Sequence, residues 1–467
     1  MSTFGALNTA YRGLTAAQQG MNVAGQNIAN AATEGYTRQR VVQSSLAAPA
    51  QGLNGSGRPL AGQGVSVDAI ARLGSGLLDS GVRSAGAQAG FASARSSALQ
   101  GIEGILNEPG DNGISAALQQ FWAGWQGVAN QPGETAPSGQ LLSAANSLAA
   151  KISTAYSSLE TQWQNTRSQA EDAVSSVNSA ATQVAAYNKS IRSTLAAGGS
   201  ANELIDARAK LTESIARLAG GTVREQADGT VDVHVGGNAL VMGDSVRTLK
   251  LSGSQSGDSL GSSVQLEWTD RPGAVPAGGQ IAGALSALAP ADKGGLIAAA
   301  AASHDTFATD LAKAVNAVHE TGQAPNPNSD KAFFETLGSS AAKSLRVIPQ
   351  TAGDIAVGDP ASGPKDGSIA DRIAQLGVGT KSPDAAWQGV VTQIGVESRG
   401  AQQHESLSSA AEISALSGRA SQASVSLDEE NLSLLTNQHA YQAAARVMSA
   451  IDEALDVLIN RTGIVGR

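Results

Sequence analysis

Large apolar residues recur every seven positions near the start of the chain. The row comprises Leu7, Leu14, Met21 and Ile28, and a row of small residues runs beside it at Ala10, Ala17, Ala24 and Ala31. Alternating steps of three and four residues place both rows on one narrow face of an α-helix. The pattern predicts an N-terminal helix of about 30 residues.

The C-terminal end of the chain carries a matching stripe. Its two rows are Leu427, Leu434, Tyr441, Met448 and Leu455, and Ala444, Ile451 and Leu458. One such stripe is typical of an ordinary core-facing helix. Matched stripes at both ends favour two terminal helices that pair as a coiled coil. Their apolar contact is small compared with the entropy lost on ordering both ends, so we expect them to be mobile in the free monomer and to order on assembly.

The middle of the chain predicts long helices. Residues 140–197 contain neither Gly nor Pro and keep a helical period throughout, which indicates one continuous helix. Further helical patterns lie near 201–218, 298–319 and 384–423, although glycines weaken the last of these.

Strand signals lie between the helical segments. In TVREQADGTVDVHV, the Asp228-Gly229 pair separates two alternating runs, which is a strong hairpin signal. Strand character continues to about Trp268, and a weaker patch, with SLRVIPQ as its clearest strand, lies near 330–380. The sequence therefore predicts a mainly α protein with β insertions, that is, a multi-domain α+β fold.

The chain runs out and returns, so its two ends are expected to share domains. Residues 1–45 with 425–467 are predicted to form a terminal coiled-coil domain. Residues 46–219 with 280–424 are predicted to form a central long-helix domain that includes the minor β patch. Residues 220–279 are predicted to form a β-rich outer insertion.

Composition narrows the functional classes. The chain has 467 residues, a net charge of −9 and no cysteine. No segment supplies the basic face of a nucleic-acid-binding protein, and the apolar runs are too short to span a membrane. The absence of cysteine excludes disulfides and thiolate metal sites. The N-terminus lacks the basic start and apolar core of a cleavable signal peptide, so a cytosolic protein and export without cleavage both fit.

Motifs for catalysis or metal binding are absent from the sequence. The five histidines are scattered, and no H-E-x-x-H, P-loop or G-x-S-x-G pattern occurs. Asp428, Glu429 and Glu430 are adjacent, but neighbouring side chains on a helix diverge, so a solvated acidic turn is a better interpretation than a metal site. Trp122 and Trp125 share one helix face and are expected in the core. The sequence predicts no enzyme, no cofactor and no metal.

The segment NIANAATEGYTRQR, residues 27–40, resembles the N-terminal signature of the axial proteins of the bacterial flagellum. An A-N-x-x-T-x-G-Y turn follows the first helix in that class, and Asn30, Thr33, Gly35 and Tyr36 match it. We expect Gly35 to help end the helix and Tyr36 to anchor the turn through a polar partner for its hydroxyl. Residues 37–43 are expected to continue as an extended segment.

The C-terminal segment limits the resemblance to one family within the axial proteins. SVSLDEENLSLLTNQHAYQAAARVMSAIDEALDVLI, from Ser424, is similar to the corresponding segment of the flagellar hook-associated protein 1 (FlgK) family, where V-N-L-D-E-E precedes a helix carrying Y-Q-x-A-Y-Q-A. Ser426, Asn437 and His439 replace the usual Asn, Tyr and Gln. Two internal stretches, ANELIDARAKL and LAKAVNAVHETG, also resemble segments of that family, with departures at Ala209 and Lys210.

The resemblance implies a structural subunit that joins the flagellar hook to the filament. It implies type III export without a cleaved signal peptide, an extracellular location in the flagellum, and a tubular homo-oligomer whose terminal helices form the inner layer. The implied partners are the hook protein, the second junction protein (hook-associated protein 3) and an export chaperone; neither nucleic acid nor membrane is expected. The expected assembly interface is Leu7, Leu14, Met21, Ile28, Leu427, Leu434, Tyr441, Met448, Ile451, Leu455 and Leu458.

Two alternatives stay open. The turn motif is shared by the whole axial class, so a distal rod, hook, second junction or flagellin-like subunit would also carry it. An enzymatic or adhesive activity hosted by the β insertion is the alternative outside that class.

Overall fold

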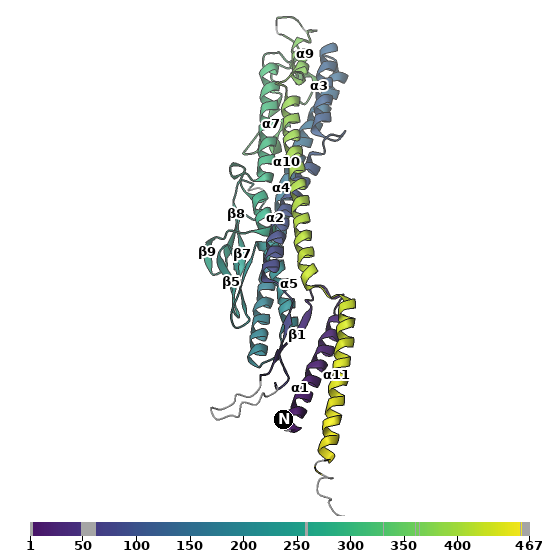
Figure 1. Ribbon diagram of the computed structural model, residues 1–467. Helices are drawn as coiled ribbons and strands as arrows, with labels where there is room; N and C mark the ends of the chain where they lie inside the picture. The colour runs from purple at the N-terminus through teal and green to yellow at the C-terminus, as the bar shows by residue number, and fades with distance from the viewer. Residues whose placement is uncertain are drawn as a thin grey trace, which may run out of the picture.

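The computed structural model describes residues 3–47, 62–256, 260–329, 331–359, 361–363, 365–457 and 459. It is an elongated molecule in which a bundle of long helices has a β insertion on its side and a pair of helices at one end (Figure 1). The prediction of a mainly α protein with β insertions is confirmed.

The pair at the end of the molecule is made of the first and last helices. Helix α1 (Thr3–Ala29) and helix α11 (Leu427–Asp456) run side by side in opposite directions (Figure 1). The predicted pairing of terminal helices is therefore confirmed. A two-stranded antiparallel sheet, β1 (Gln39–Ser45) with β2 (Val65–Arg72), connects α1 to the bundle. The predicted extended segment after Tyr36 is β1, whereas β2 was not predicted.

The bundle is built around α4 (Thr135–Ala196), a single helix of 62 residues. At about 1.5 Å per residue it is about 90 Å long. Its neighbours in the bundle are α2 (Gly76–Leu106), α3 (Ile114–Asn130), α5 (Asn202–Ala219), α6 (Gly279–Leu288) and α7 (Leu296–His319), and α10 (Pro383–Ala423) packs on α2 and α7. The predictions of α4, α5, α7 and α10 are confirmed, and α10 continues through its glycines because it packs along α2.

The bundle core holds most of the few aromatic residues. Phe121, Trp125, Phe333 and Trp387 are fully buried, and the ring centroids of Trp125 and Phe333 are 5.0 Å apart. Trp122 is also buried, and its indole Nε1 donates a hydrogen bond of 2.7 Å to Asp384 Oδ2. The expectation that Trp122 and Trp125 belong to the core is confirmed.

The β insertion consists of two small antiparallel sheets. The first pairs β3 (Thr222–Glu225), β4 (Val231–Val235), β5 (Asn238–Met242) and β6 (Ser245–Val246) in that order. The second pairs β7 (Leu249–Gly253), β8 (Val264–Trp268) and β9 (Arg271–Ala274). The Asp228-Gly229 turn lies between β3 and β4, as predicted, and Gly229 has φ 81°. Alternate residues of β4 pack on the valines of α4, which holds the insertion on the bundle.

The weaker β patch is mostly irregular. It contains β10 (Phe334–Glu335), α8 (Ala341–Ser344), β11 (Arg346–Val347) and α9 (Ser368–Ala374). The SLRVIPQ strand is shorter than expected, because only two of its residues pair with β10. Short 3-10 helices occur at Ala291–Lys293, Ala352–Asp354 and Gln375–Gly377. The division of the chain into three domains stays a prediction.

Candidate functional site: the terminal helix pair and its polar hinge

The two terminal helices meet along a seam with a seven-residue repeat. Gly13 faces Ala444, and Gly20 faces Asn437, one heptad further along. At the next heptad, Asn27 Nδ2 donates a hydrogen bond of 3.0 Å to Glu430 Oε2. Glycine at the seam lets the helix axes approach closely, since a Cβ atom on Gly20 would lie 2.3 Å from Asn437 Oδ1.

Small residues, more than large ones, fill this seam within one chain. Ala10, Ala17 and Ala24 of the predicted small row are buried, whereas Ala31 is exposed in the turn after α1. The large residues that we predicted for assembly are half-buried: Leu7, Leu14, Met21, Ile28, Leu434, Tyr441, Met448, Ile451 and Leu455. Leu427 is 50% exposed, and Leu458 lies outside the described residues. Much of the apolar surface of the pair therefore faces solvent in the single chain.

The predicted helix-to-strand turn follows directly after α1. Thr33 Oγ1 donates a hydrogen bond of 3.2 Å to Asn30 Oδ1, and the backbone N–H of Tyr36 donates one of 3.1 Å to the Thr33 carbonyl oxygen. Gly35 has φ 74°, a conformation that favours glycine, and its backbone lies under the Lys210 side chain. The structure thus brings the four predicted turn residues together.

Tyr36 finds its polar partner in Asn27. The tyrosine hydroxyl donates a hydrogen bond of 2.9 Å to Asn27 Oδ1, which also accepts one of 3.0 Å from the Gln39 backbone N–H. Burial raises the pKa of Tyr36 to about 12, with a further contribution from nearby carboxylates including Glu430, so the phenol stays protonated and donates. Asn27 Nδ2 donates both to Glu430 and to the Gln39 carbonyl oxygen, so this buried amide is fully satisfied.

Arg38 joins the start of β1 to the start of α11. Its Nε donates a hydrogen bond of 2.6 Å to Glu430 Oε1, and its Nη1 donates one of 2.7 Å to Glu429 Oε2. Burial acts to lower the pKa of Arg38, but the two carboxylates outweigh it, and the pKa lies above its ordinary value. The expected solvated acidic turn is wrong for Glu430, which is only 3% exposed because Arg38 and Asn27 cover it. Asp428 and Glu429 are exposed, as expected.

The first turns of α5 hold the hinge on its bundle side. Asp206 accepts hydrogen bonds of 3.0 Å from the Thr37 backbone N–H and 2.9 Å from Thr37 Oγ1. The same carboxylate forms an ion pair of 2.7 Å with Arg72 Nε, at the end of β2. Thr37, Arg72 and Asp206 thereby connect three segments that are distant in sequence.

Asn202 and Glu203, also on α5, bind the side chain of Gln39. Asn202 Nδ2 donates a hydrogen bond of 3.0 Å to Gln39 Oε1, and Gln39 Nε2 donates one of 3.0 Å to Glu203 Oε1. Asn202, Glu203 and Asp206 were not predicted as site residues. These three residues lie in the stretch ANELIDARAKL, which resembles a segment of the FlgK family. The resemblance did not indicate which residues they contact. We call the cluster of Asn27, Tyr36, Thr37, Arg38, Gln39, Arg72, Asn202, Glu203, Asp206 and Glu430 the polar hinge.

Neither a metal centre nor a membrane span is found in the described part of the chain. No group of three or more His, Asp or Glu side chains there is arranged to hold a metal ion. None of the helices of that part combines the length and the apolar character that a membrane span needs.

Comparisons with known proteins agree with this geometry. Residues 99–334, just over half of the chain, match the family model of the flagellar hook-associated protein FlgK helical domain. The chain belongs to the FlgK family. Residues 7–37 match the flagella basal body rod protein family, and residues 416–461 match the C-terminal family of the rod proteins FlgEFG. The terminal segments therefore match families of flagellar rod proteins, and the helical middle matches the FlgK family model.

Individual relatives support the assignment. Flagellar hook-associated protein 1 of Bacillus subtilis is 28% identical over 513 residues, and the match covers all of both chains. The protein of that name from Salmonella typhimurium is 28% identical over 343 residues, which cover 71% of this chain but only 59% of the relative. The structure of the flagellar hook junction protein FlgK from Burkholderia pseudomallei matches with a TM-score of 0.59 at 16% identity, over 74% of this chain and all of that one. This last likeness shows the fold alone.

Proposed function

We propose that this member of the FlgK family is a non-enzymatic structural subunit of the junction between hook and filament, which assembles outside the cell through its terminal helices. The observation that carries the proposal is the α1–α11 pair, in which a seam of small residues holds the helices together while the large apolar rows are only partly buried and further leucines and valines of α11 are exposed. Incompletely buried apolar rows on a helix pair are a surface that further helices cover in a bundle.

The proposed assembly buries the outward rows of this pair between subunits. Apolar residues outside the predicted rows are also exposed on α11, where Leu432, Leu435 and Val447 are each at least half exposed. Water contact with so many leucines and valines is unfavourable, and removing it on association supplies the driving force. A ring or tube of identical subunits would cover the same surface on every copy.

Substitution of the apolar rows tests the proposal. Leu434→Asp and Met448→Asp place a charge on the half-buried face, so we expect the folded subunit to be lost from isolated hooks while α4 and the β insertion stay folded. Gln442→Asp, an exposed change on the same helix, is the matched control and should assemble. Normal attachment of filaments in the two apolar variants would defeat the interface assignment.

The identities of the individual binding partners are also part of the proposal. We infer that hook protein contacts one side of the assembled ring, hook-associated protein 3 contacts the other, and an export chaperone masks α11 before secretion. Exposed apolar residues on α11 are consistent with a chaperone that covers this helix. Deletion of the gene discriminates between axial subunits, because loss of the filament with an intact hook supports the junction role and loss of the hook contradicts it.

A further inference from the structure

A cavity of about 670 Å³ lies where α2, α10 and the base of the β insertion meet. One side is formed by the first half of α2, including Arg83 and Phe91, and His404 of α10 also lines the cavity. The cavity is separate from the polar hinge and from the terminal helix pair. Nothing in the proposed assembly role requires an open space at this position.

Two glycine turns form a tight wall of the cavity. Gly220 ends α5 with φ 73°, and Gly278 and Gly279 precede and begin α6. A Cβ atom on Gly220 would lie 2.6 Å from Gly278 Cα, so only glycine allows the two turns to touch. The wall is therefore close-packed backbone, and the cavity does not arise from loosely packed side chains.

Arg83 is a half-buried cation without a direct partner. Within the described part of the chain, no carboxylate oxygen lies within ion-pair distance of Arg83 and no acceptor hydrogen-bonds to its guanidinium. The neighbouring arginines differ, since Arg217 pairs with Glu412 and Arg419 pairs with Glu213. Burial lowers the pKa of Arg83, against the longer-range effect of carboxylates that include Asp79. A guanidinium has five N–H donors, so Arg83 is left with donors that a ligand in the cavity could use.

The other lining groups are mostly small or apolar. Phe91, Val223 and Ala282 supply apolar surface, and Ser84 and His404 add polar atoms at exposed positions. A carboxylate fits the guanidinium fork with two parallel hydrogen bonds, and an attached apolar body would cover the ring of Phe91. We propose that this cavity binds a small organic acid with an apolar body, and that Arg83 is the charge partner of its carboxylate.

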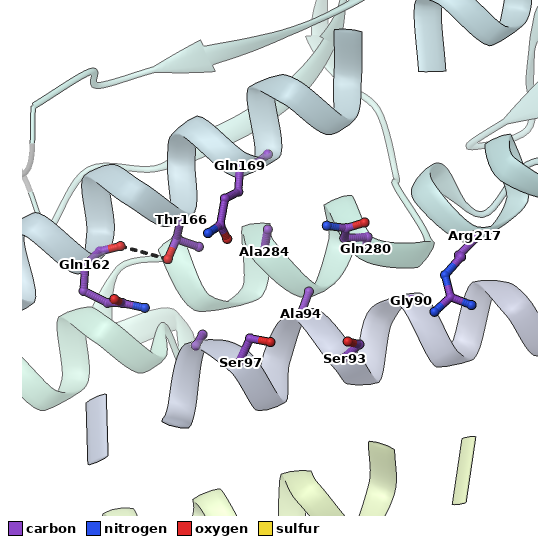
Figure 2. Close-up of a pocket in the computed structure, with 12 residues that line it drawn as sticks. Gly90, Ser93, Ala94, Ser97, Gln162, Thr166, Gln169, Arg217, Gln280 and Ala284 are labelled. Atoms are coloured by element: carbon purple, nitrogen blue, oxygen red, sulfur yellow. Dashed lines mark hydrogen bonds between the residues drawn. The ribbon is translucent and has the colours of Figure 1, made fainter. Parts of the chain in front are cut away.

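A neighbouring cavity lacks the unpaired cation and the apolar surface of the proposed site. That cavity, of about 180 Å³, lies between α2, α4 and α6, and Figure 2 shows hydroxyl and amide side chains such as Ser97, Gln162 and Gln169 around it. Its cation, Arg217, is already held by Glu412. It offers no free charge and little apolar surface, so it is not suited to the same ligand.

Benzoate is a suitable probe, since it joins a carboxylate to a flat apolar ring. We expect ligand-observed NMR on the full chain to detect benzoate binding, and the neutral isostere benzyl alcohol to bind at least about tenfold more weakly. Arg83→Gln should weaken benzoate binding by at least about tenfold. Arg399→Gln removes the same charge from an exposed position on α10 and should leave binding unchanged.

Each outcome bears on the proposal. Equal binding of benzoate and benzyl alcohol to the wild-type chain would overturn the charge partnership, even if the Arg83 variant failed to fold. Inorganic phosphate that binds as tightly as benzoate would overturn the requirement for an apolar body. A wild-type dissociation constant for benzoate above about 10 mM would overturn the site as a whole.

Discussion

Asn27 and Glu430 are 403 positions apart in the chain, and their side chains share a buried hydrogen bond of 3.0 Å at the point where the terminal helix pair meets the bundle. Asn27 is 1% exposed and Glu430 is 3% exposed. Glu430 also accepts a hydrogen bond from Arg38, and Asn27 binds Tyr36 and Gln39, so a single carboxylate of α11 joins a network built from residues 27–39. Without Glu430, the Asn27 amide and the Arg38 guanidinium would each lose an acceptor.

Removal of the Glu430 carboxylate should loosen the terminal pair. Glu430→Ala leaves the Arg38 guanidinium and the Asn27 amide short of an acceptor in a buried position. We expect the free energy that holds the terminal helix pair on the bundle to fall by about 2–4 kcal/mol. The loss is smaller than for a fully buried ion pair because Arg38 is partly exposed. Hydrogen exchange with mass spectrometry should show faster exchange in α1 and in the first turns of α11, with α4 unchanged.

Glu429→Ala is the matched control for that variant. Glu429 also binds Arg38, but its side chain is 63% exposed, so its ion pair is screened by water and its removal should cost less than about 1 kcal/mol. If both variants accelerated exchange equally, burial of the Glu430 carboxylate would not be what stabilises the hinge.

The glycine seam predicts opposite effects for two substitutions on the same helix. A Cβ atom on Gly20 would lie within 3 Å of three atoms of the Asn437 side chain, whereas one on Gly25 meets nothing within 4 Å. Gly25→Ala should stabilise α1 by about 0.5–1 kcal/mol through helix propensity. Gly20→Ala must displace the Asn437 side chain, whose Nδ2 donates to the Ser433 carbonyl oxygen, so it should lower the protection of α1. Amide-exchange protection of α1 measures both, and equal protection in the two variants would contradict the seam.

The periodic parts of the fold could be predicted from the sequence because periodicity reports which face of an element is buried. The long helix α4, the paired termini and the Asp228-Gly229 turn all follow from local patterns. Helix α2 was not predicted, and of α3 only the helical spacing of Trp122 and Trp125 was recognised. Many of the buried positions of α2 are alanine, glycine and serine, which give a weak apolar signal.

The polar hinge could be predicted only in part. Tyr36 was expected to bind a polar group, but the identity of Asn27 as that group depends on the fold. Asp206 and Glu430 are carboxylates that look solvated in the sequence, and they are buried because arginines distant in sequence cover them. No local pattern encodes a contact between such distant positions. The assignment of the large apolar rows to subunit contacts also stays a prediction, since a single chain does not test it.

The free subunit should be least stable at its two ends. Helix α1 packs mainly against α11, β1 and β2, and it buries small side chains there. Small contacts stabilise little, so we expect amide protons of α1 and α11 to exchange faster than those of α4 in the isolated chain. Assembly on hooks should then slow exchange in both terminal helices. Protection of α1 equal to that of α4 in the free subunit would contradict the expectation that the ends order on assembly.

His319 gives the bundle a pH dependence whose sign can be worked out. Its Nδ1–H donates a hydrogen bond of 2.7 Å to the Lys331 carbonyl oxygen, and its Nε2 accepts one of 3.0 Å from the Ala356 backbone N–H. The ring must be neutral to make both bonds, and burial lowers its pKa below the ordinary value of about 6.5. The pKa of His304 is also lowered by burial.

Above about pH 6.5 both histidines are neutral in the folded and the unfolded chain, so they add no pH dependence. Below that value the unfolded chain takes up protons that the folded chain does not, and the free energy of unfolding falls until the lowered folded pKa values are reached. Urea unfolding at about pH 7.5 and about pH 5.5 should show a smaller difference for His319→Gln than for the wild type. His439→Gln alters an exposed imidazole on α11 and should keep the wild-type difference; if His319→Gln kept it too, the pH dependence would have to come from other groups.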